Sequence, residues 1–324
     1  MATVIVTGAS GFVGCRLVPM LVTRGHRVIA TSRRQQTYSA STKKQKTIEW
    51  REISAESSDQ EWRDLIQEGD YLIHLAARVH VMREKPQDAL PAHLKTNTDF
   101  TKRLATISEE QELRRFVFVS TIKVLGEKTL ESPFDEISRD DPQDPYSESK
   151  RLAEIALREV CASGNMEFVI VRPTLVIGDG ASGNLDRLIR WIASRWPIPL
   201  GGISNSRSLV SVETLCEILI RSLDNQQVAD ETILAAEPDA ISTPELIESL
   251  ARGYRRPARL LKMPRFFFGF FRQMPFIGKS VARLTESLVV DSSATYAKLG
   301  WRPVVSIRDR LQAVGERFRD STSS

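Results

Sequence analysis

VIVTGASGFVG, residues 4–14, places a short run of β-branched apolar residues directly before glycines at positions 8, 11 and 14. The apolar run predicts a buried strand, and the amphipathic pattern that begins at Gly14 predicts a helix. Glycines in the turn between them permit unusual backbone angles, and the free N–H groups of the helix N-terminus favour an anion such as a pyrophosphate. An ordinary strand–helix turn fits the glycine spacing equally well, so the interpretation depends on the rest of the chain.

The composition describes a globular protein and excludes several function classes. Among 324 residues, a net charge of +4 is too small to indicate a nucleic-acid partner. Three scattered cysteines predict no disulfide framework and a reducing, cytoplasmic location, and the four histidines show no metal-ligand spacing. The first residues enter a strand at once, which leaves no room for a signal peptide, and no apolar run is long enough to span a bilayer.

Strand and helix patterns alternate along the first half of the chain, which predicts an α/β fold: a Rossmann-like, doubly wound parallel sheet. Helical patterns occupy about 59–67, 89–109 and 146–161, and strand patterns follow the glycine turn at 27–31, 47–50, 71–75, 116–120 and 168–171. Beyond residue 173 the chain is punctuated by glycine and proline. A strand and helix over 209–223 are expected to return to the sheet, and a further strand is expected at 231–236. We therefore expect a dinucleotide-binding domain from residues 1–173 and about 208–236, with an interleaved, smaller substrate domain from about 174–207 and 237–320.

Tyr146 and Lys150 stand four residues apart in YSESK, at the start of a predicted helix. Residues at this spacing share one helix face, so the phenol and the ammonium can point into the same cleft. A lysine cation lowers the pKa of a nearby tyrosine by roughly one to three units, which would make Tyr146 an acid or base near neutrality. The alternative is that Tyr146 and Lys150 are two surface residues of an amphipathic helix with no catalytic role.

A third feature is a strand, VFVST, that ends in hydroxyl groups at Ser120 and Thr121. Open α/β sheets bind ligands at the carboxyl ends of their strands, so Thr121 is placed to hydrogen-bond the substrate oxygen that Tyr146 serves. The simpler interpretation is that Ser120 and Thr121 only cap the end of the strand. The glycine turn, the hydroxyl and the Tyr-x-x-x-Lys pair in this order make coincidence a poor explanation.

These motifs resemble the extended short-chain dehydrogenase/reductases, in the branch of nucleotide-sugar epimerases and reductases. The resemblance covers nearly the whole chain. Residues 7–14 match the family's T-G-x-x-G-x-x-G, residues 74–77 match its HLAA strand motif, and Asn97 matches the asparagine of the next helix. Residues 120–124 match the hydroxyl-bearing strand, and residues 172–174 match the exit strand.

The resemblance implies catalytic roles for Thr121, Tyr146 and Lys150. Tyr146 would exchange a proton with the sugar oxygen, while Thr121 holds that oxygen and Lys150 binds the nicotinamide ribose. No metal is required. The residues that it implies for cofactor binding are Gly8, Ser10, Gly11, Phe12, Val13, Gly14, Ser32, Arg33, Arg34, Ile53, Leu75, Ala76, Ala77, Asn97, Val119, Tyr146, Lys150, Pro173 and Thr174.

Two positions bear on the reaction. Dehydratases of the family carry Thr-Asp-Glu where this chain has Thr121, Ile122 and Lys123, so a 4-ketoreductase and a 4-epimerase remain. After the second strand, an acid would bind the ribose of NAD, but the sequence reads Ser32-Arg33-Arg34, and an arginine fork suits the 2′-phosphate of NADP. NADP(H) is therefore preferred, with NAD(H) as the alternative, and NADPH favours a reductase.

The resemblance also implies a UDP-sugar partner. The implied substrate-binding residues are Thr121, Lys123, Asn184, Leu185, Pro199, Leu200, Arg207 and Arg283. Leu175 replaces an asparagine common in epimerases, which fits a less polar, 6-deoxy sugar. We expect reduction of a UDP-4-keto-6-deoxy-N-acetylhexosamine for surface-polysaccharide synthesis. The alternatives are a 4-epimerase with tightly held NAD and a non-catalytic dinucleotide-sensing protein.

Two further expectations concern assembly. The helices that start near Ala89 and Tyr146 resemble those that form the family's dimer interface, so a homodimer is expected. Residues 263–279 gather six phenylalanines between basic residues. This segment could lie on a membrane surface, but packing onto the core or a partner subunit is the favoured interpretation.

Overall fold

The computed structural model describes residues 1–34, 47–79, 86–180, 184–263 and 278–322. Its centre is a seven-stranded sheet in the order β3-β2-β1-β4-β5-β6-β9, in which every neighbouring pair is parallel. The predicted Rossmann-like fold is confirmed. The strands are β1 (Thr3–Thr7), β2 (Arg27–Ser32), β3 (Ile48–Glu52), β4 (Tyr71–His74), β5 (Arg115–Val119), β6 (Glu167–Pro173) and β9 (Glu231–Ala235).

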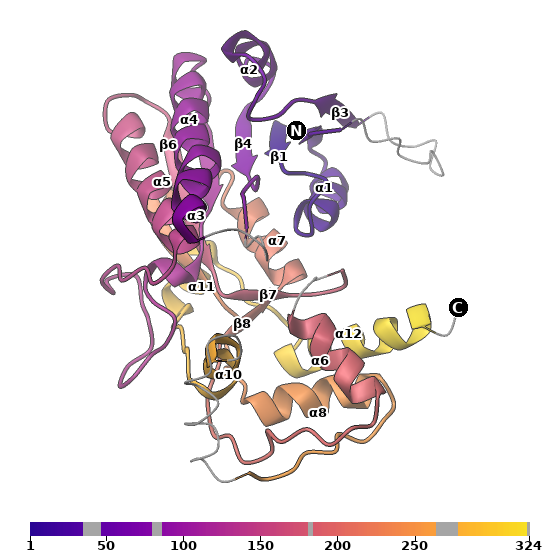
Figure 1. Ribbon diagram of the computed structural model, residues 1–324. Coiled ribbons are helices and arrows are strands. Elements are labelled where there is room, and N and C mark those ends of the chain that lie inside the picture. The colour runs from indigo at the N-terminus through magenta and orange to yellow at the C-terminus, as the bar shows by residue number, and fades with distance from the viewer. Residues whose placement is uncertain (35–46, 80–85, 181–183, 264–277, 323–324) are drawn as a thin grey trace.

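Helices cover both faces of this sheet, as Figure 1 shows. One face packs against α1 (Gly14–Thr23), α7 (Val212–Arg221) and α11 (Ser293–Leu299). The other packs against α2 (Asp59–Ile66), α4 (Phe100–Glu110) and α5 (Pro145–Cys161). The single helix predicted over 89–109 is instead three consecutive segments: α3 (Pro86–His93), a π-helical turn (Leu94–Asp99) and α4.

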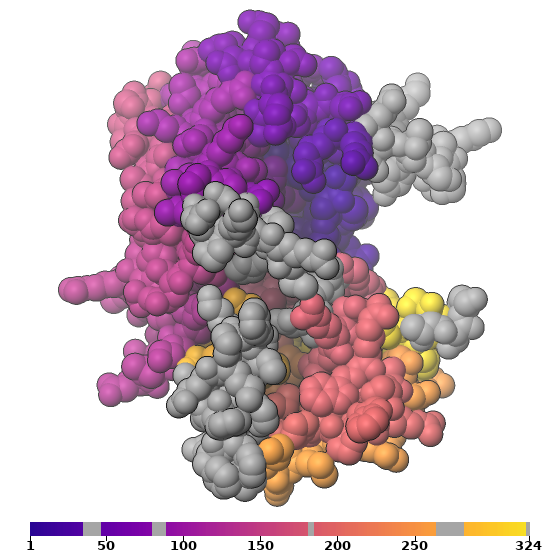
Figure 2. Space-filling view, viewed as in Figure 1, coloured from indigo at the N-terminus to yellow at the C-terminus, as the bar shows by residue number. Residues whose placement is uncertain are grey.

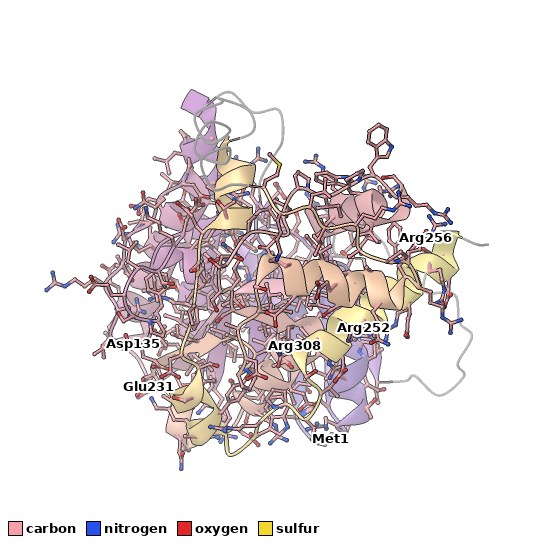
Figure 3. The ribbon with its side chains drawn as sticks, turned by 90° about the horizontal axis from the view of Figure 1, so that it is seen from below. Met1, Asp135, Glu231, Arg252, Arg256 and Arg308 are labelled. Carbon is pink, nitrogen blue, oxygen red and sulfur yellow. The ribbon has the colours of Figure 1, made fainter. Side chains whose placement is uncertain are left out.

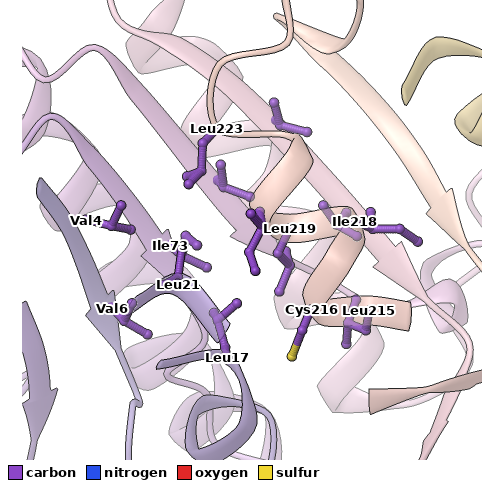
Figure 4. Close-up of a cluster of buried hydrophobic side chains, with 14 of the residues drawn as sticks. Val4, Val6, Leu17, Leu21, Ile73, Leu215, Cys216, Ile218, Leu219 and Leu223 are labelled. Carbon is purple, nitrogen blue, oxygen red and sulfur yellow. The ribbon is translucent and has the colours of Figure 1, made fainter. Parts of the chain in front are cut away.

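The alternation of side chains along β1 builds the two cores. Val4 and Val6 face α1 and α7, where Leu17 and Leu219 are fully buried, and Ile5 points to the opposite face. Figure 4 shows this first cluster, with α7 laid across the strands. Burial of an apolar side chain contributes about 1.5–3 kcal/mol, so these strands are held in register by the pattern of the opening sequence.

The chain leaves the sheet after β6 and builds the lower half of the molecule in Figure 1. We predicted that the strand at 209 would return to the main sheet, and this is wrong: β8 (Leu209–Ser211) pairs with β7 (Leu175–Ile177) in a separate two-stranded parallel sheet. Among the described strands that follow β6, only β9 returns to the main sheet, at the edge beside β6. The remaining elements are α6 (Asn184–Ala193), α8 (Thr243–Gly253), α10 (Gly278–Thr285), α12 (Ile307–Thr322) and 3-10 turns at Ile122–Val124 and Gln226–Val228.

A third apolar cluster joins α6, α8 and α12 and forms the core of the lower half. Most of the phenylalanine-rich segment, residues 264–277, lies outside the described residues. Within the described ranges, no helix combines the length and apolar character that crossing a bilayer demands.

Candidate active site

The glycine turn after β1 leaves no room for side chains. Gly8 has φ +67°, and a Cβ there would lie 2.9 Å from the amide nitrogen of Ala76. A Cβ on Gly14 would lie 2.5 Å from the carbonyl oxygen of Ala9. The Gly11 N–H donates to the Gly8 carbonyl at 2.9 Å, closing the turn. A cradle lined by backbone at the N-terminus of α1 suits the pyrophosphate of a dinucleotide.

His74, at the end of β4, is hydrogen-bonded to Thr7, the residue directly before this turn. Its Nδ1 lies 2.6 Å from the hydroxyl of Thr7, and its Nε2 lies 3.1 Å from the hydroxyl of Thr101. Thr101 donates its proton to the carbonyl of Asn97, and the amide of Ala76 donates to Thr7. His74 therefore donates from Nε2 and accepts at Nδ1. It is fully buried, and desolvation lowers its pKa to about 3, so it stays neutral.

The carboxyl end of β2 carries the residues expected to select the dinucleotide. Ser32 is buried and donates to the carbonyl of Arg34 at 2.5 Å, whereas Arg33 and Arg34 are exposed. Ile53 donates its amide to the Ser32 carbonyl at 3.1 Å, and the exposed Glu52 of β3 stands opposite Ser32 in the ladder. Two guanidinium groups thus lie next to the strand end where the adenosine ribose of a Rossmann-type cofactor binds.

Asn97 lies in the π-helical turn and is buried. Its side chain accepts from the Arg78 amide at 2.7 Å and donates to the Ser149 hydroxyl at 2.9 Å. Ser149 in turn donates to the carbonyl of Tyr146 at 2.7 Å. Asn97 thus joins the loop after β4 to the first turn of α5. Sequence reasoning missed Ser149, although it lies within the YSESK motif.

The start of α5 fixes the position of Tyr146. Asp144 is the N-cap and forms a reciprocal capping box with Ser147, and Pro145 follows the cap. This Asp-Pro pair before the helix is a start signal in the sequence. Lys123 reaches Asp144 with an N–O distance of 2.6 Å, so the turn after β5 is tied to the cap of α5. Lys123 and hydrogen bonds from Ser147 hold the pKa of Asp144 down at about 2.

The structure corrects the expected acid–base balance of Tyr146 and Lys150. Burial, with a smaller contribution from the Asp144 charge, raises the pKa of Tyr146 rather than lowering it. Lys150 is 2% exposed, its Nζ lies 4.2 Å from the centroid of the Phe118 ring, and desolvation lowers its pKa to about 7. The prediction of a Tyr146 pKa lowered toward neutrality is therefore wrong for this structure, because burial of the phenol sets the direction of the shift.

A buried carboxylate links the strand end at Ser120 to α5. Glu154, one turn after Lys150, is 0% exposed and accepts from the Ser120 hydroxyl at 2.5 Å. Arg172 on β6 donates to both of its oxygens, at 3.0 and 2.6 Å, and also to Asp140 at 3.0 Å. The next residue, Thr121, is 8% exposed, and its hydroxyl accepts from the Lys123 amide. Sequence reasoning missed Glu154, although its i,i+4 spacing from Lys150 places it on the same helix face.

Basic residues gather near the turn after β5. Arg207 donates to the Glu286 carbonyl at 3.0 Å, and burial together with the charge of Arg283 lowers the pKa of Arg207. Arg283 lies 3.6 Å from Glu127, which also pairs with Lys123 at 2.9 Å. The structure thus brings Lys123, Arg207 and Arg283, which were predicted as substrate contacts, into one cluster.

The structure places the other residues that were predicted to bind the cofactor or the substrate as follows. Phe12 lies against Gly178, and the hydroxyl of Thr174 donates a hydrogen bond to the carbonyl of Ala235. Val119 ends β5, Pro173 is buried at the end of β6, and Asn184 begins α6. Leu200 is buried, and the partly buried residues are Val13, Leu75, Ala77, Leu185 and Pro199, whereas Ser10 is exposed.

This combination defines a dinucleotide-dependent enzyme with a tyrosine and a lysine on one helix. Residues 4–235 match the family described as "NAD dependent epimerase/dehydratase family", and the chain belongs to that family. A Vibrio cholerae protein named UDP-glucose 4-epimerase is 32% identical over 98% of this chain and 95% of its own length.

Solved structures share the whole fold. UDP-glucuronic acid 4-epimerase from Bacillus cereus, in complex with NAD, is 19% identical with a TM-score of 0.78, over 99% of this chain and 98% of its own. UDP-N-acetylglucosamine 4-epimerase from the same organism is 16% identical with a TM-score of 0.79, over 98% and 100%. At these identities the likeness concerns the fold alone.

Proposed function

We propose that this enzyme is an NADP(H)-dependent 4-ketoreductase that acts on a UDP-4-keto-6-deoxy-N-acetylhexosamine. The observation that carries the proposal is the end of β2, where Arg33 and Arg34 are exposed beside the buried Ser32 and no acid follows the strand. A guanidinium fork suits a 2′-phosphate, which NADP has and NAD lacks. A cell keeps NADP largely reduced, so the preference for NADP(H) favours a single reduction.

The turn after β5 argues against water elimination. Ile122, at one of the two positions where dehydratases of the family carry acids, is an apolar side chain that is 3% exposed and packs in a core cluster. Lys123, at the other position, forms ion pairs with Asp144 and Glu127. Neither position therefore supplies the carboxyl group that the dehydratases of the family carry there.

The chain's own residues would bind the sugar oxygen and supply its proton. The bound nicotinamide supplies the hydride. Tyr146 gives its phenolic proton to the C4 oxygen, while Thr121, whose oxygen already accepts from the Lys123 amide, keeps its proton and donates a hydrogen bond to the same oxygen. The pKa of Lys150, about 7, leaves a fraction of it charged at neutral pH, and that charge stabilises the phenolate left by the transfer.

The cationic cluster suits the nucleotide end of the substrate. Arg207 and Arg283 would bind the diphosphate, since two guanidinium groups can form charge-assisted hydrogen bonds to its oxygens. Leu200 and Pro199 would lie along the uracil, with Asn184 and Leu185 nearby, as the family resemblance implies. Leu175, the first residue of β7, is an apolar side chain that is 56% exposed, which fits a 6-deoxy sugar.

A 4-epimerase that retains NAD is the second candidate. The 32% identity to the Vibrio cholerae protein over nearly the whole chain favours it. Glu52, opposite Ser32, offers a carboxylate near the ribose position if the backbone of residues 32–34 rearranges on binding.

The two candidates are separated by incubating the purified protein with the 4-keto-6-deoxy sugar nucleotide and either NADPH or NADH. Loss of absorbance from the reduced nicotinamide with NADPH, absent in Tyr146→Phe, supports the proposal. Interconversion of UDP-N-acetylhexosamines without added cofactor would instead establish the epimerase. A Tyr146→Phe protein as active as the parent would contradict any catalytic assignment, and a dinucleotide-sensing role would then remain.

We further propose a homodimer that forms through the helical segments that run from Ala89 through α4 and through α5, as the family resemblance implies. Sedimentation equilibrium of the purified protein tests this: a single species of one-chain mass would contradict it.

A further inference from the structure

A second surface of interest lies on the lower half, away from the glycine turn. Residues 193–201 run beside residues 256–261: Ile198 pairs with Leu260, and the Gly201 amide donates to the Leu261 carbonyl at 2.9 Å. Arg256 donates to the carbonyl of Ala193, and Arg259 to that of Arg195 at 3.4 Å. We call residues 186–196 and 252–263 together the basic face; it does not include residues 264–277.

The charge of the basic face is one-sided. It holds eight of the 45 lysines and arginines but one of the 41 acidic residues, Asp186, so the rest of the chain carries 37 basic and 40 acidic residues. Asp186 pairs with Arg190 at 2.9 Å. The end of α12, residues 316–320, packs beside the face and adds two arginines and two acids, which leaves the balance unchanged.

Large apolar side chains are exposed among these charges. Trp196 is 72% exposed, Leu261 52% and Trp191 37%. The inner side of α6 is fixed in the core by Leu188 and Ile192. Figure 2 shows residues 184–200, in salmon, on the surface of the lower half, and Figure 3 shows Arg252 and Arg256 at the end of α8 from below.

We propose that the basic face docks on an anionic lipid surface, with Trp196 and Leu261 inserted between the headgroups. Arginine and lysine near such a surface are attracted to its negative charge, and tryptophan prefers the boundary between headgroup and acyl chain. A second copy of this chain is a poor occupant, because the face would meet its own excess of positive charge. A nucleic acid would match the charge and could stack on Trp191 and Trp196, but it offers no apolar environment for the exposed aliphatic side chain of Leu261, which a lipid surface does.

Co-sedimentation of the full-length protein with vesicles tests the proposal. We expect binding to vesicles that contain phosphatidylglycerol, weakened by salt, and little binding to vesicles of phosphatidylcholine alone. Arg259→Gln and Lys262→Gln should each weaken the partition about fivefold. Trp196→Ser should weaken it further. A matched control is Arg302→Gln with Val304→Ser: both residues are exposed, Val304 at 98%, and lie outside the basic face.

Activity on a soluble nucleotide sugar and the circular dichroism spectrum should be unchanged in all these variants, which shows that they fold. No binding to phosphatidylglycerol vesicles, or equal losses in the control, would overturn the proposal. Tighter binding to a single-stranded oligonucleotide than to the vesicles, or a loss of dimer in Trp196→Ser, would overturn it in favour of a nucleic acid or a second copy.

Discussion

Arg172→Met should lower the free energy of unfolding by about 3–5 kcal/mol, because it leaves Glu154 buried without its main partner. Glu154 is 0% exposed, and the two Arg172 nitrogens lie 3.0 and 2.6 Å from its oxygens. At an effective dielectric constant of about 20, unit charges roughly 3 Å apart attract each other by about 5–6 kcal/mol. Arg158, at 3.3 Å, and the Ser120 hydroxyl remain in the variant and keep the loss toward the lower end of the range.

The control is an ion pair on the surface whose N–O distance matches that of Arg172 and Glu154. Arg24 and Glu217 are 2.6 Å apart, but the Arg24 side chain is 44% exposed. Arg24→Met should therefore change stability by less than about 1 kcal/mol, since solvent screens the pair. Urea unfolding followed by circular dichroism, with linear extrapolation, measures both variants.

The double variant Glu154→Leu with Arg172→Met removes the charge and its partner together. Apolar replacement of a complete buried pair is often close to neutral, so the double variant should be more stable than Arg172→Met alone. Equal losses in Arg172→Met and Arg24→Met, or a double variant as unstable as the sum of its singles, would refute the reasoning.

Three other outcomes follow from the site. Gly14→Ala should weaken binding of the reduced dinucleotide at least about tenfold in a fluorescence titration, because its Cβ would lie 2.5 Å from the Ala9 carbonyl oxygen and must displace the cradle; unchanged affinity would contradict that cradle. Lys150, whose pKa is about 7 when folded, takes up a proton on unfolding between pH 7 and about 10.4, so the parent should gain stability as pH rises through this window. The Lys150→Met variant should lack that gain in urea unfolding at each pH, and parallel profiles would argue against a buried lysine. Arg283→Gln should raise the KM for the nucleotide sugar about 10–100-fold with kcat little changed; a loss confined to kcat would count against a diphosphate contact.

Local patterns predicted most of the sheet, since strands such as 4–7 and 168–171 are short apolar runs between turn residues and their burial follows from composition. The glycines, Tyr146 and Lys150 were placed by spacing alone, because one turn or one helix face fixes their geometry. The strand at 209–211 was assigned to the wrong sheet, since three residues carry no information about which edge they pair with.

The electrostatics of the site could not be predicted from the sequence. The pKa of Tyr146 depends on how deeply the phenol is buried, and burial is a property of packing between α5 and the turns around it. The His74 bridge depends on Thr7 and Thr101, which stand 67 and 27 residues away in the chain. Ion pairs such as Arg172 with Glu154 likewise join an exit strand and a helix whose side-chain directions are set only once both pack on the sheet.

The return of β9 to the edge beside β6 has a consequence for synthesis on the ribosome. When Pro173 has emerged, six of the seven strands exist, but the outer edge of β6 exposes a bare row of amides and carbonyls. The chain must extend through the whole excursion to Ala235 before that row is paired. An unpaired, apolar edge is a template for association with other chains. Nascent chains paused between residues 174 and 230 should therefore be those that most need chaperone protection.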